Sequence, residues 1–240
     1  MAFARRNARE LVRDPLTVGF SLGFPLVLLA LLTIIQRNIP VSMFEIDRLA
    51  PGVAAFGLTF AALFSATLIA RDRASSLMLR LCASPMRPGD FIAGYLTPML
   101  PLCAAQIAVC YAAALAAGLK LGGNAILSML TLLPAAALYV AIGLLCGTLL
   151  NDRQVGGVCG ALLTNLTAWL SGTWFDLKLV GGAFEKVAYA LPFVHAVEIE
   201  RAVLAGNWAG VFPHLWWVLG YMALTLAAAV LLFLRQMRRQ

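Results

Sequence analysis

Residues 71–90 read RDRASSLMLRLCASPMRPGD, a charged stretch between two apolar blocks that are each long enough to cross a bilayer. On a helix that advances ~100° per residue, one side of this stretch carries Arg73, Ser76, Arg80 and Ser84. The neighbouring sector carries apolar residues at the spacing of a buried stripe, namely Ala74, Leu77, Met78 and Leu81. Pro85 ends such a helix. The pattern predicts a short amphipathic helix beneath the membrane that a cytoplasmic partner binds; an ordinary solvated loop is the alternative.

The composition excludes an ordinary soluble globular protein. Hydrophobic residues make up 62% of the 240 residues and charged residues only 12%, whereas about 25% of residues are charged in soluble domains. We therefore predict an all-α membrane protein with a single transmembrane domain over residues 1–240. Four of the five cysteines lie in apolar runs, and no Cys/His cluster has metal-ligand spacing. We expect neither a disulfide nor a metal site.

The first fifteen residues form a separate amphipathic segment. Over residues 3–14 the apolar side chains Ala4, Ala8, Leu11 and Val12 share one helical face. The opposite face holds the charged residues Arg5, Arg6, Arg9, Glu10 and Arg13. This predicts an interfacial helix over residues 1–15, lying on the membrane with its arginines toward anionic lipid headgroups. A basic tail without fixed structure is the alternative, and a cleavable signal peptide is not expected.

Six apolar stretches are each close to the ~20 residues that the hydrocarbon thickness requires. They predict transmembrane helices at 16–36, 51–70, 91–117, 125–150, 155–172 and 212–234. The connection between the last two, residues 173–211, is too apolar for a free loop, but its apolar runs are too short to span. We predict short re-entrant helices that enter the outer leaflet there, with a plain external loop as the alternative.

The distribution of lysine and arginine orients the predicted spans. Twelve of the eighteen basic residues fall on one side of the bilayer with five carboxylates, and six basic residues fall on the other side with six carboxylates. The whole net charge of +7 therefore lies on one side, which must be cytoplasmic. Both termini are then cytoplasmic. We expect a multi-pass protein of the cell (inner or plasma) membrane, in contact with lipids and not with nucleic acid.

No Asp, Glu, Lys or Arg lies within the predicted spans, which argues against a self-powered ion-coupled carrier. The chain has no P-loop, zinc-hydrolase or serine-hydrolase motif, so we expect a non-catalytic subunit without a cofactor of its own. The candidate pathway residues are aromatic groups spaced by four and a few polar groups, namely Phe56, Phe60, Phe64, Gln106, Thr164 and Asn165. Core packing and interhelical hydrogen bonds are the alternative roles for these residues.

Four motifs carry a family resemblance. They are Arg13-Asp14-Pro15, Leu49-Ala50-Pro51-Gly52, the run from Arg71-Asp72-Arg73 to Arg80-Leu81-Cys82-Ala83-Ser84-Pro85-Met86-Arg87, and Leu191-Pro192-Phe193-Val194-His195. With them the chain resembles the ABC-2 type permeases, the six-span membrane subunits of ATP-binding-cassette exporters. The resemblance implies that residues 71–90 contain a coupling helix seated in a cleft of the ATPase. The ATPase-coupling residues would be Arg71, Asp72, Arg73, Leu77, Arg80, Leu81, Ser84, Pro85 and Arg87. The family's frequent Glu-x-Gly after the arginines is replaced here by Ala74-Ser75-Ser76, so an ion pair from that glutamate is not expected.

The resemblance also implies a function and partners. We expect two ATPase subunits, which bind ATP and Mg, and a second permease subunit that is identical or homologous to this one. The expected cargo is a hydrophobic or amphipathic compound of antibiotic or drug type, exported from the cytoplasm or the inner leaflet. Export of a lipid-linked glycan or polysaccharide is the alternative within the family. A membrane-embedded enzyme or scaffold without an ATPase is the alternative from another class.

Overall fold

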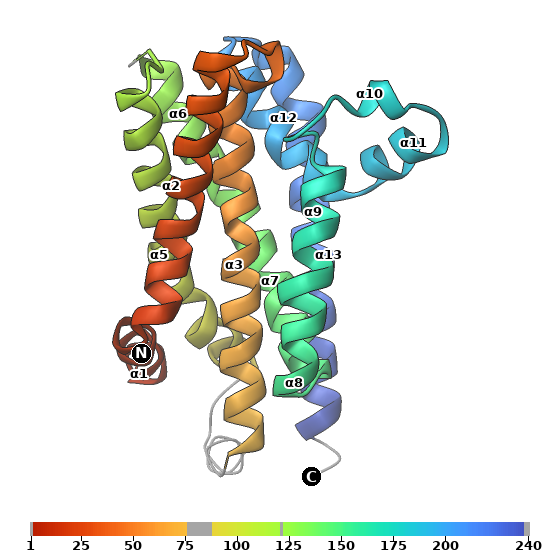
Figure 1. Ribbon diagram of the computed structural model, residues 1–240. Coiled ribbons are helices and arrows are strands. Elements are labelled where there is room, and N and C mark those ends of the chain that lie inside the picture. Colours follow the sequence, from red (N-terminus) through yellow and green to blue (C-terminus); the bar gives the residue numbers. More distant parts are fainter. Residues whose placement is uncertain (1, 76–87, 121, 238–240) are drawn as a thin grey trace.

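The computed structural model describes residues 2–75, 88–120 and 122–237, and within them the chain forms helices and no strands. The long helices lie side by side in one bundle (Figure 1). In chain order the elements are α1 (Ala2–Arg13), α2 (Pro15–Asn38), η1 (Ser42–Phe44), α3 (Ile46–Ala74), α5 (Pro88–Ala116), α6 (Gly123–Thr131), α7 (Leu133–Leu149), α8 (Asp152–Val155), η2 (Gly156–Leu163), α9 (Thr164–Leu170), α10 (Leu177–Val180), α11 (Gly182–Ala190), α12 (Pro192–Leu204) and α13 (Trp208–Met237). The prediction of an all-α membrane protein is confirmed.

Among the described residues, five helical stretches are long and apolar enough to cross a membrane: Pro15–Asn38, Ile46–Ala74, Gly89–Ala116, Gly123–Leu149 and Trp208–Arg235. They coincide with five of the six predicted spans, the fourth being made of α6 and α7. The other predicted span, 155–172, falls on α8, η2 and α9, which follow one another without a break and run beside α3 (Figure 1). Because η2 is π-helical, it divides this segment into three helical pieces, each of which is shorter than a span. The six-span count stays a prediction.

Helix α3 forms the centre of the bundle. Of its most apolar stretch 72% is buried, against 17% for the corresponding stretches of α2 and α13, which lie on the outside. Helix α7 approaches α3 closely because it presents glycines at the contact. A Cβ at Gly147 would lie 2.5 Å from the carbonyl oxygen of Ala66, and a Cβ at Gly143 would overlap Ser65 and the backbone of Ala62. This close packing explains the glycines spaced by four in α7.

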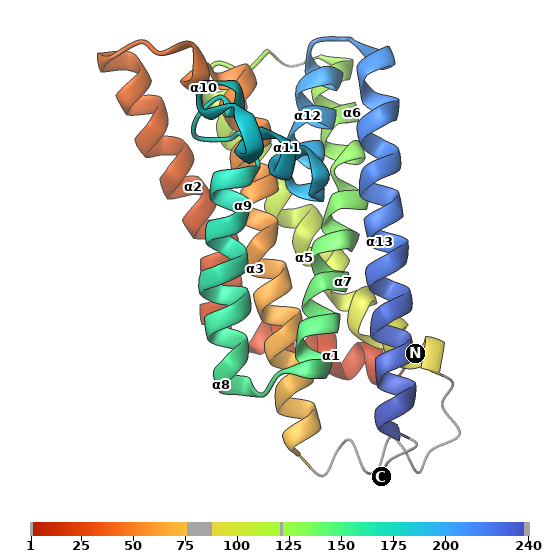
Figure 2. The same ribbon diagram turned by 90° about the vertical axis from the view of Figure 1, so that its right-hand side faces the viewer.

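Helix α1 crosses one end of the bundle at a steep angle to the long helices (Figure 2). The ring of Phe3 packs on Phe91 and Tyr95 of α5, with ring centroids 5.7 and 5.1 Å apart. The buried Asn7 side chain donates a hydrogen bond to the carbonyl oxygen of Gly94 at 3.0 Å. The predicted amphipathic pattern is therefore only partly right, because polar Asn7 faces the bundle whereas Val12 is 76% exposed.

Residues 173–211 contain the short helices α10, α11 and α12. Helix α12 is well packed, with most of its residues buried beside α6 and α13. This segment is therefore not a free loop, as its apolar composition predicts. Its entry into the outer leaflet stays a prediction.

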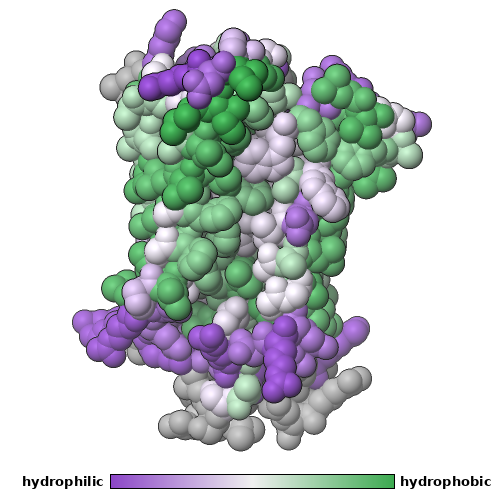
Figure 3. Space-filling view, in the orientation of Figure 1, coloured by the Kyte–Doolittle hydropathy of each residue, from purple (hydrophilic) through white to green (hydrophobic). Residues whose placement is uncertain are grey.

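The two ends of the bundle differ in content. Helix α1, α8 and the last turns of α3 lie at the lower end in Figure 1, and η1, α10 and α12 lie toward the upper end. Figure 3 shows a hydrophilic band across the lower end below a largely hydrophobic surface. We call the end that carries α1 the basic end, because the arginines of α1 lie there together with Arg71 and Arg73 of the last turn of α3.

Candidate functional site

A buried carboxylate joins three helices at the basic end. Asp72, in the last turns of α3, is 3% exposed. Its two oxygens accept hydrogen bonds from Arg6 of α1 at 2.7 and 2.9 Å. The hydroxyl of Tyr95, from α5, donates to the same carboxylate at 2.7 Å and is itself fully buried. We call Arg6, Asp72 and Tyr95 the Asp72 cluster. A two-point arginine–carboxylate pair of this kind fixes both distance and orientation.

The position of Arg6 corrects one expectation from the sequence. The helical pattern of α1 predicts that all four arginines face lipid headgroups, but Arg6 turns toward Asp72 and also pairs with Glu10 at 2.7 Å. The hydrogen bond with Asp72 raises the pKa of Arg6, against partial burial, which lowers it. Arg6 is therefore a charged structural contact between α1 and α3.

The two arginines beside Asp72 contact different helices. Arg73 donates to the carbonyl oxygens of Gly147 and Leu150 at 2.8 and 3.2 Å, at the C-terminal end of α7. A cation is favoured there because the last carbonyls of a helix have no partner within it. Arg71 is exposed and lies 3.6 Å from the carboxylate of Asp152 in α8. Together Arg71, Asp72 and Arg73 thus anchor the end of α3 to α1, α5, α7 and α8.

The rest of the predicted coupling segment belongs to residues 76–87. Its candidate residues Leu77, Arg80, Leu81, Ser84, Pro85 and Arg87 lie outside the described residues. The described helices on either side, α3 and α5, end and begin at the basic end. The coupling role of the whole segment therefore stays a prediction.

A cavity of about 1190 Å³ lies between α1, α2 and α3 at the basic end, with Met99 of α5 also in its wall. We call it the inner cavity. Its apolar wall includes Phe20 of α2 and Phe60 and Phe64 of α3. Its polar wall includes charged residues of α1, the α1–α2 junction and α3, namely Arg6, Arg9, Glu10, Arg13, Asp14 and Arg71. Three of the four predicted interfacial arginines and two of the three predicted pathway phenylalanines therefore meet here.

An aromatic row runs from the inner cavity toward the other end of the bundle. Phe64, Phe60 and Phe56 follow one another along α3, with successive ring centroids 6.4 and 6.5 Å apart. Phe56 then meets Trp174 at 5.4 Å, and Phe24 of α2 packs on Phe60 at 5.2 Å. The spacing of four places these rings on one side of α3. The row forms an apolar wall, and its rings also stabilise the packing of α2 on α3.

The polar candidates of the pathway lie in two different environments. Gln106 is buried, and its amide nitrogen donates to the carbonyl oxygen of Ala54 at 3.3 Å, which is an interhelical bond between α5 and α3. Asn165 is exposed on α9 and donates to Ala161 of the preceding turn at 2.8 Å. The hydroxyl of half-buried Thr164 donates to the backbone carbonyl oxygen of Cys159 at 3.2 Å. Figure 3 shows a paler, less hydrophobic strip over the region of α3 and α9.

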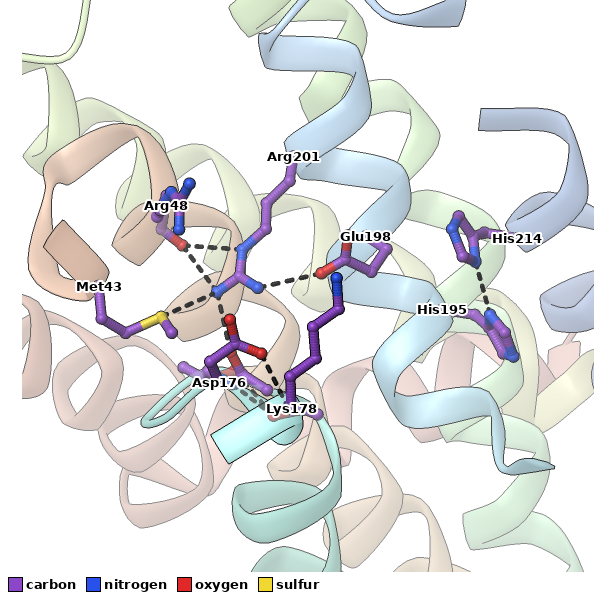
Figure 4. Close-up of polar contacts among 11 residues, drawn as sticks. Met43, Arg48, Asp176, Lys178, His195, Glu198, Arg201 and His214 are labelled. Atoms are coloured by element: carbon purple, nitrogen blue, oxygen red, sulfur yellow. Dashed lines mark hydrogen bonds and ion pairs between the residues drawn. The ribbon is translucent and has the colours of Figure 1, made fainter. Parts of the chain in front are cut away.

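An arginine that the sequence analysis did not select organises the opposite end (Figure 4). Arg201 of α12 donates to the carbonyl oxygens of Gly172 and Arg48 at 2.9 and 3.4 Å, and to Glu198 at 3.1 Å. These bonds connect α12 to the start of α3 and to the turn after α9. A cavity of about 510 Å³ adjoins Arg201, and its wall also includes Asp176 and other charged residues.

The sequence analysis also did not select Glu200 of α12 as a candidate residue. It is fully buried, and its carboxyl group contacts hydroxyl groups from α5 and α6: Tyr111 and Thr131 at 3.0 Å each, and Ser128. Burial raises the pKa of Glu200 to about 8. The sequence does indicate that Glu200 is buried, because it shares one helical face with the apolar residues Val197 and Val203 at a spacing of three.

The two histidines of the chain meet where α12 packs on α13 (Figure 4). Their Nδ1 atoms are 2.7 Å apart, and Nε2 of His195 lies 3.0 Å from the carbonyl oxygen of Tyr189. Glu198, three residues after His195 in the sequence, pairs with Arg201 and not with either histidine. Within the described ranges no group of three or more metal-ligating side chains occurs.

Comparison with known proteins identifies the family of this chain. A family model described as ABC-2 type transporter matches residues 1–205, which extend from α1 through α12. A comparison with curated proteins found no match. The match includes the Asp72 cluster, the inner cavity and the aromatic row. The chain therefore belongs to the ABC-2 type transporter family, whose members form the membrane-spanning permease part of ABC transporters.

Proposed function

We propose that this chain is the permease subunit of an exporter for hydrophobic or amphipathic compounds of antibiotic or drug type. The observation that carries the proposal is the inner cavity, whose wall combines phenylalanines with arginines at the basic end. Ligand pockets for small molecules typically have mostly apolar walls with a few polar groups that orient the ligand. A compound dissolved in the inner leaflet could place its apolar part against Phe60 and Phe64, with its polar part near α1.

The energy for export comes from separate subunits. Two ATPase subunits bind ATP and Mg and contact residues 76–87, and a second permease, identical or homologous, completes the pathway. Movement of that segment is transmitted because its flanking helices are tied together. Asp72 before it and Tyr95 after it meet in one cluster with Arg6 of α1. Since α1 also forms part of the wall of the inner cavity, we expect that a push on the segment between α3 and α5 alters the shape of that cavity.

The aromatic row supplies the route through the membrane. Its rings extend from Phe64 beside the inner cavity to Trp174, which lies after α9. Exposed Asn165 and half-buried Thr164 lie on the neighbouring segment and are suited to a surface that faces a second permease or a wet path rather than lipid. The basic end faces the cytoplasm, because the net positive charge gathers there. The protein lies in the cell membrane with both termini inside.

One observation favours a second candidate cargo. Rows of aromatic side chains suit sugar rings as well as drug-like molecules, and five aromatic residues line up here: Phe24, Phe56, Phe60, Phe64 and Trp174. Export of a lipid-linked glycan would use the same wall. The half-buried positions of Phe60 and Phe64 favour the smaller amphipathic compound, because both also pack within the bundle.

The test is ATP hydrolysis by the complex of this chain with the ABC ATPase that copurifies with it. Amphipathic fluorescent drugs should stimulate hydrolysis, and Phe64→Ala should reduce the stimulation several-fold because it removes part of the cavity wall. Phe212→Ala is the matched control, since Phe212 is exposed on α13 away from the cavity. Failure of any ATPase to copurify, or equal loss in both variants, would contradict the proposal.

A further inference from the structure

The arginines around the inner cavity differ in whether a carboxylate already neutralises them. Arg6 pairs with Asp72 and Glu10 at 2.7 Å each, and Arg71 lies 3.6 Å from Asp152. Arg9 and Arg13 contact no carboxylate in the part of the chain that the structure describes. Both are exposed and both contribute to the cavity wall. Two positive charges at the cavity are therefore not compensated.

The carboxylates of the cavity are already bound elsewhere. Glu10 pairs with Arg6. Asp14 caps the N-terminus of α2 by accepting hydrogen bonds from the backbone nitrogen and the hydroxyl of Thr17 at 3.2 and 2.8 Å. These bonds lower the pKa of Asp14, so it stays ionised in that position. Neither carboxylate is placed to compensate Arg9 or Arg13.

The two free arginines are four residues apart on α1 and so lie on the same side of the helix, one turn from each other. They contribute to the wall of a cavity whose apolar part, from α2 and α3, contains the aromatic groups Phe20, Phe60 and Phe64. A ligand that satisfies both walls needs a negative headgroup and an apolar tail. Arginine suits phosphate because its planar guanidinium donates two parallel hydrogen bonds.

We propose that the inner cavity binds one amphiphile with an anionic, phosphate-type headgroup, which Arg9 and Arg13 neutralise while its tail lies against the phenylalanines of α2 and α3. Arg6 takes no part in this binding, because its guanidinium is held by Asp72. If this ligand is the cargo, the proposed cargo is an anionic amphiphile; this role as cargo rests on the proposed function. The binding itself needs neither ATP nor the ATPase.

The experiment measures binding of short-chain lipids to the purified full-length chain in a non-ionic detergent by native mass spectrometry. The probes are dioctanoyl-phosphatidylglycerol, which is anionic, dioctanoyl-phosphatidylcholine, which is zwitterionic, and inorganic phosphate. We expect the anionic lipid to bind at least about tenfold more tightly than the other two, as charge-assisted bonds from two arginines imply. Equal binding of the two lipids would overturn the proposal. Inorganic phosphate that binds as tightly as the anionic lipid would also overturn it, because the cavity would then bind an anion without using the apolar tail.

The variants distinguish this site from general attraction of a basic helix to lipid. Arg9→Gln with Arg13→Gln should lose the preference for the anionic lipid by about tenfold, and Arg9→Lys with Arg13→Lys should retain part of it. Arg5→Gln is the matched control, because Arg5 is exposed on the same helix but does not contribute to the cavity wall. An equal loss in Arg5→Gln would overturn the proposal. Phe64→Ala should weaken the binding of both lipids to the same extent, because it removes part of the apolar wall.

The outcome is separable from that of the proposed function. If the lipid preference is absent while amphipathic drugs still stimulate ATP hydrolysis, the anionic site is wrong and the permease function stands. If the preference is present but no ATPase copurifies, the site stands and the transport role is wrong. Unchanged elution of each variant in size-exclusion chromatography confirms that the folded chain was measured.

Discussion

Replacing Asp72 should release α1 from the bundle, because this carboxylate is the acceptor for both Arg6 and Tyr95. In Asp72→Ala the buried Tyr95 hydroxyl loses its acceptor, which costs about 1–3 kcal/mol. The ion pair contributes about 1 kcal/mol more, because the Arg6 side chain is 39% exposed and its interaction is screened by water. We expect a total loss of about 2–4 kcal/mol in the free energy that holds α1 in place.

Amide hydrogen exchange within α1 measures this local free energy directly. A loss of about 2–4 kcal/mol corresponds to exchange that is about 30- to 1,000-fold faster, since each ~1.4 kcal/mol is a factor of ten. Asp72→Asn should have a smaller effect, because the amide oxygen can still accept from Tyr95. Glu10→Gln is the control, an exposed helical pair worth about 0.3–0.5 kcal/mol. If Asp72→Ala accelerates exchange no more than Glu10→Gln does, the Asp72 cluster does not hold α1.

Three further predictions follow from packing, burial and charge. Gly143→Ala should destabilise the bundle by about 1–3 kcal/mol in detergent unfolding, because the methyl group meets the backbone of α3, whereas Gly156→Ala, with open space around it, should not. The folded state holds the Glu200 proton up to about pH 8, whereas the unfolded state loses it near 4.5. The free energy of unfolding should therefore fall as pH rises through this window, by at most about 1.4 kcal/mol per pH unit, and Glu200→Gln should flatten that slope. Leu77→Asp or Leu81→Asp should abolish ATP-driven transport in vesicles without reducing the amount of protein inserted in the membrane; normal transport would contradict the coupling role of residues 76–87.

Hydropathy and helical periodicity predict most of the long elements. Five of the predicted spans coincide with helices, because a run of about 20 apolar residues has few alternatives in a bilayer. Within the fourth predicted span α6 gives way to α7 at Leu133, just before Pro134, as expected where a proline interrupts the helical hydrogen bonds. The π-helical η2 could not be predicted, because its apolar residues fit an α-helix equally well.

The contacts of charged residues were predicted less well, because sequence counts assign a charge to a side of the membrane and not to a partner. Arg6 and Asp72 are 66 residues apart, and their pairing depends on how α1 crosses the bundle. Glu200 was counted among external carboxylates, although α12 buries it against α5 and α6. Arg201 was likewise counted only as an external charge. Each of these contacts depends on the packing of helices that are distant in sequence.

The most direct test of the central claim is transport by the purified chain in liposomes, alone and together with its copurified ATPase. An amphipathic fluorescent compound is the probe, and its movement across the bilayer is followed with and without ATP. The account predicts movement only when both the ATPase and hydrolysable ATP are present. Movement by the chain alone at the same rate would contradict it.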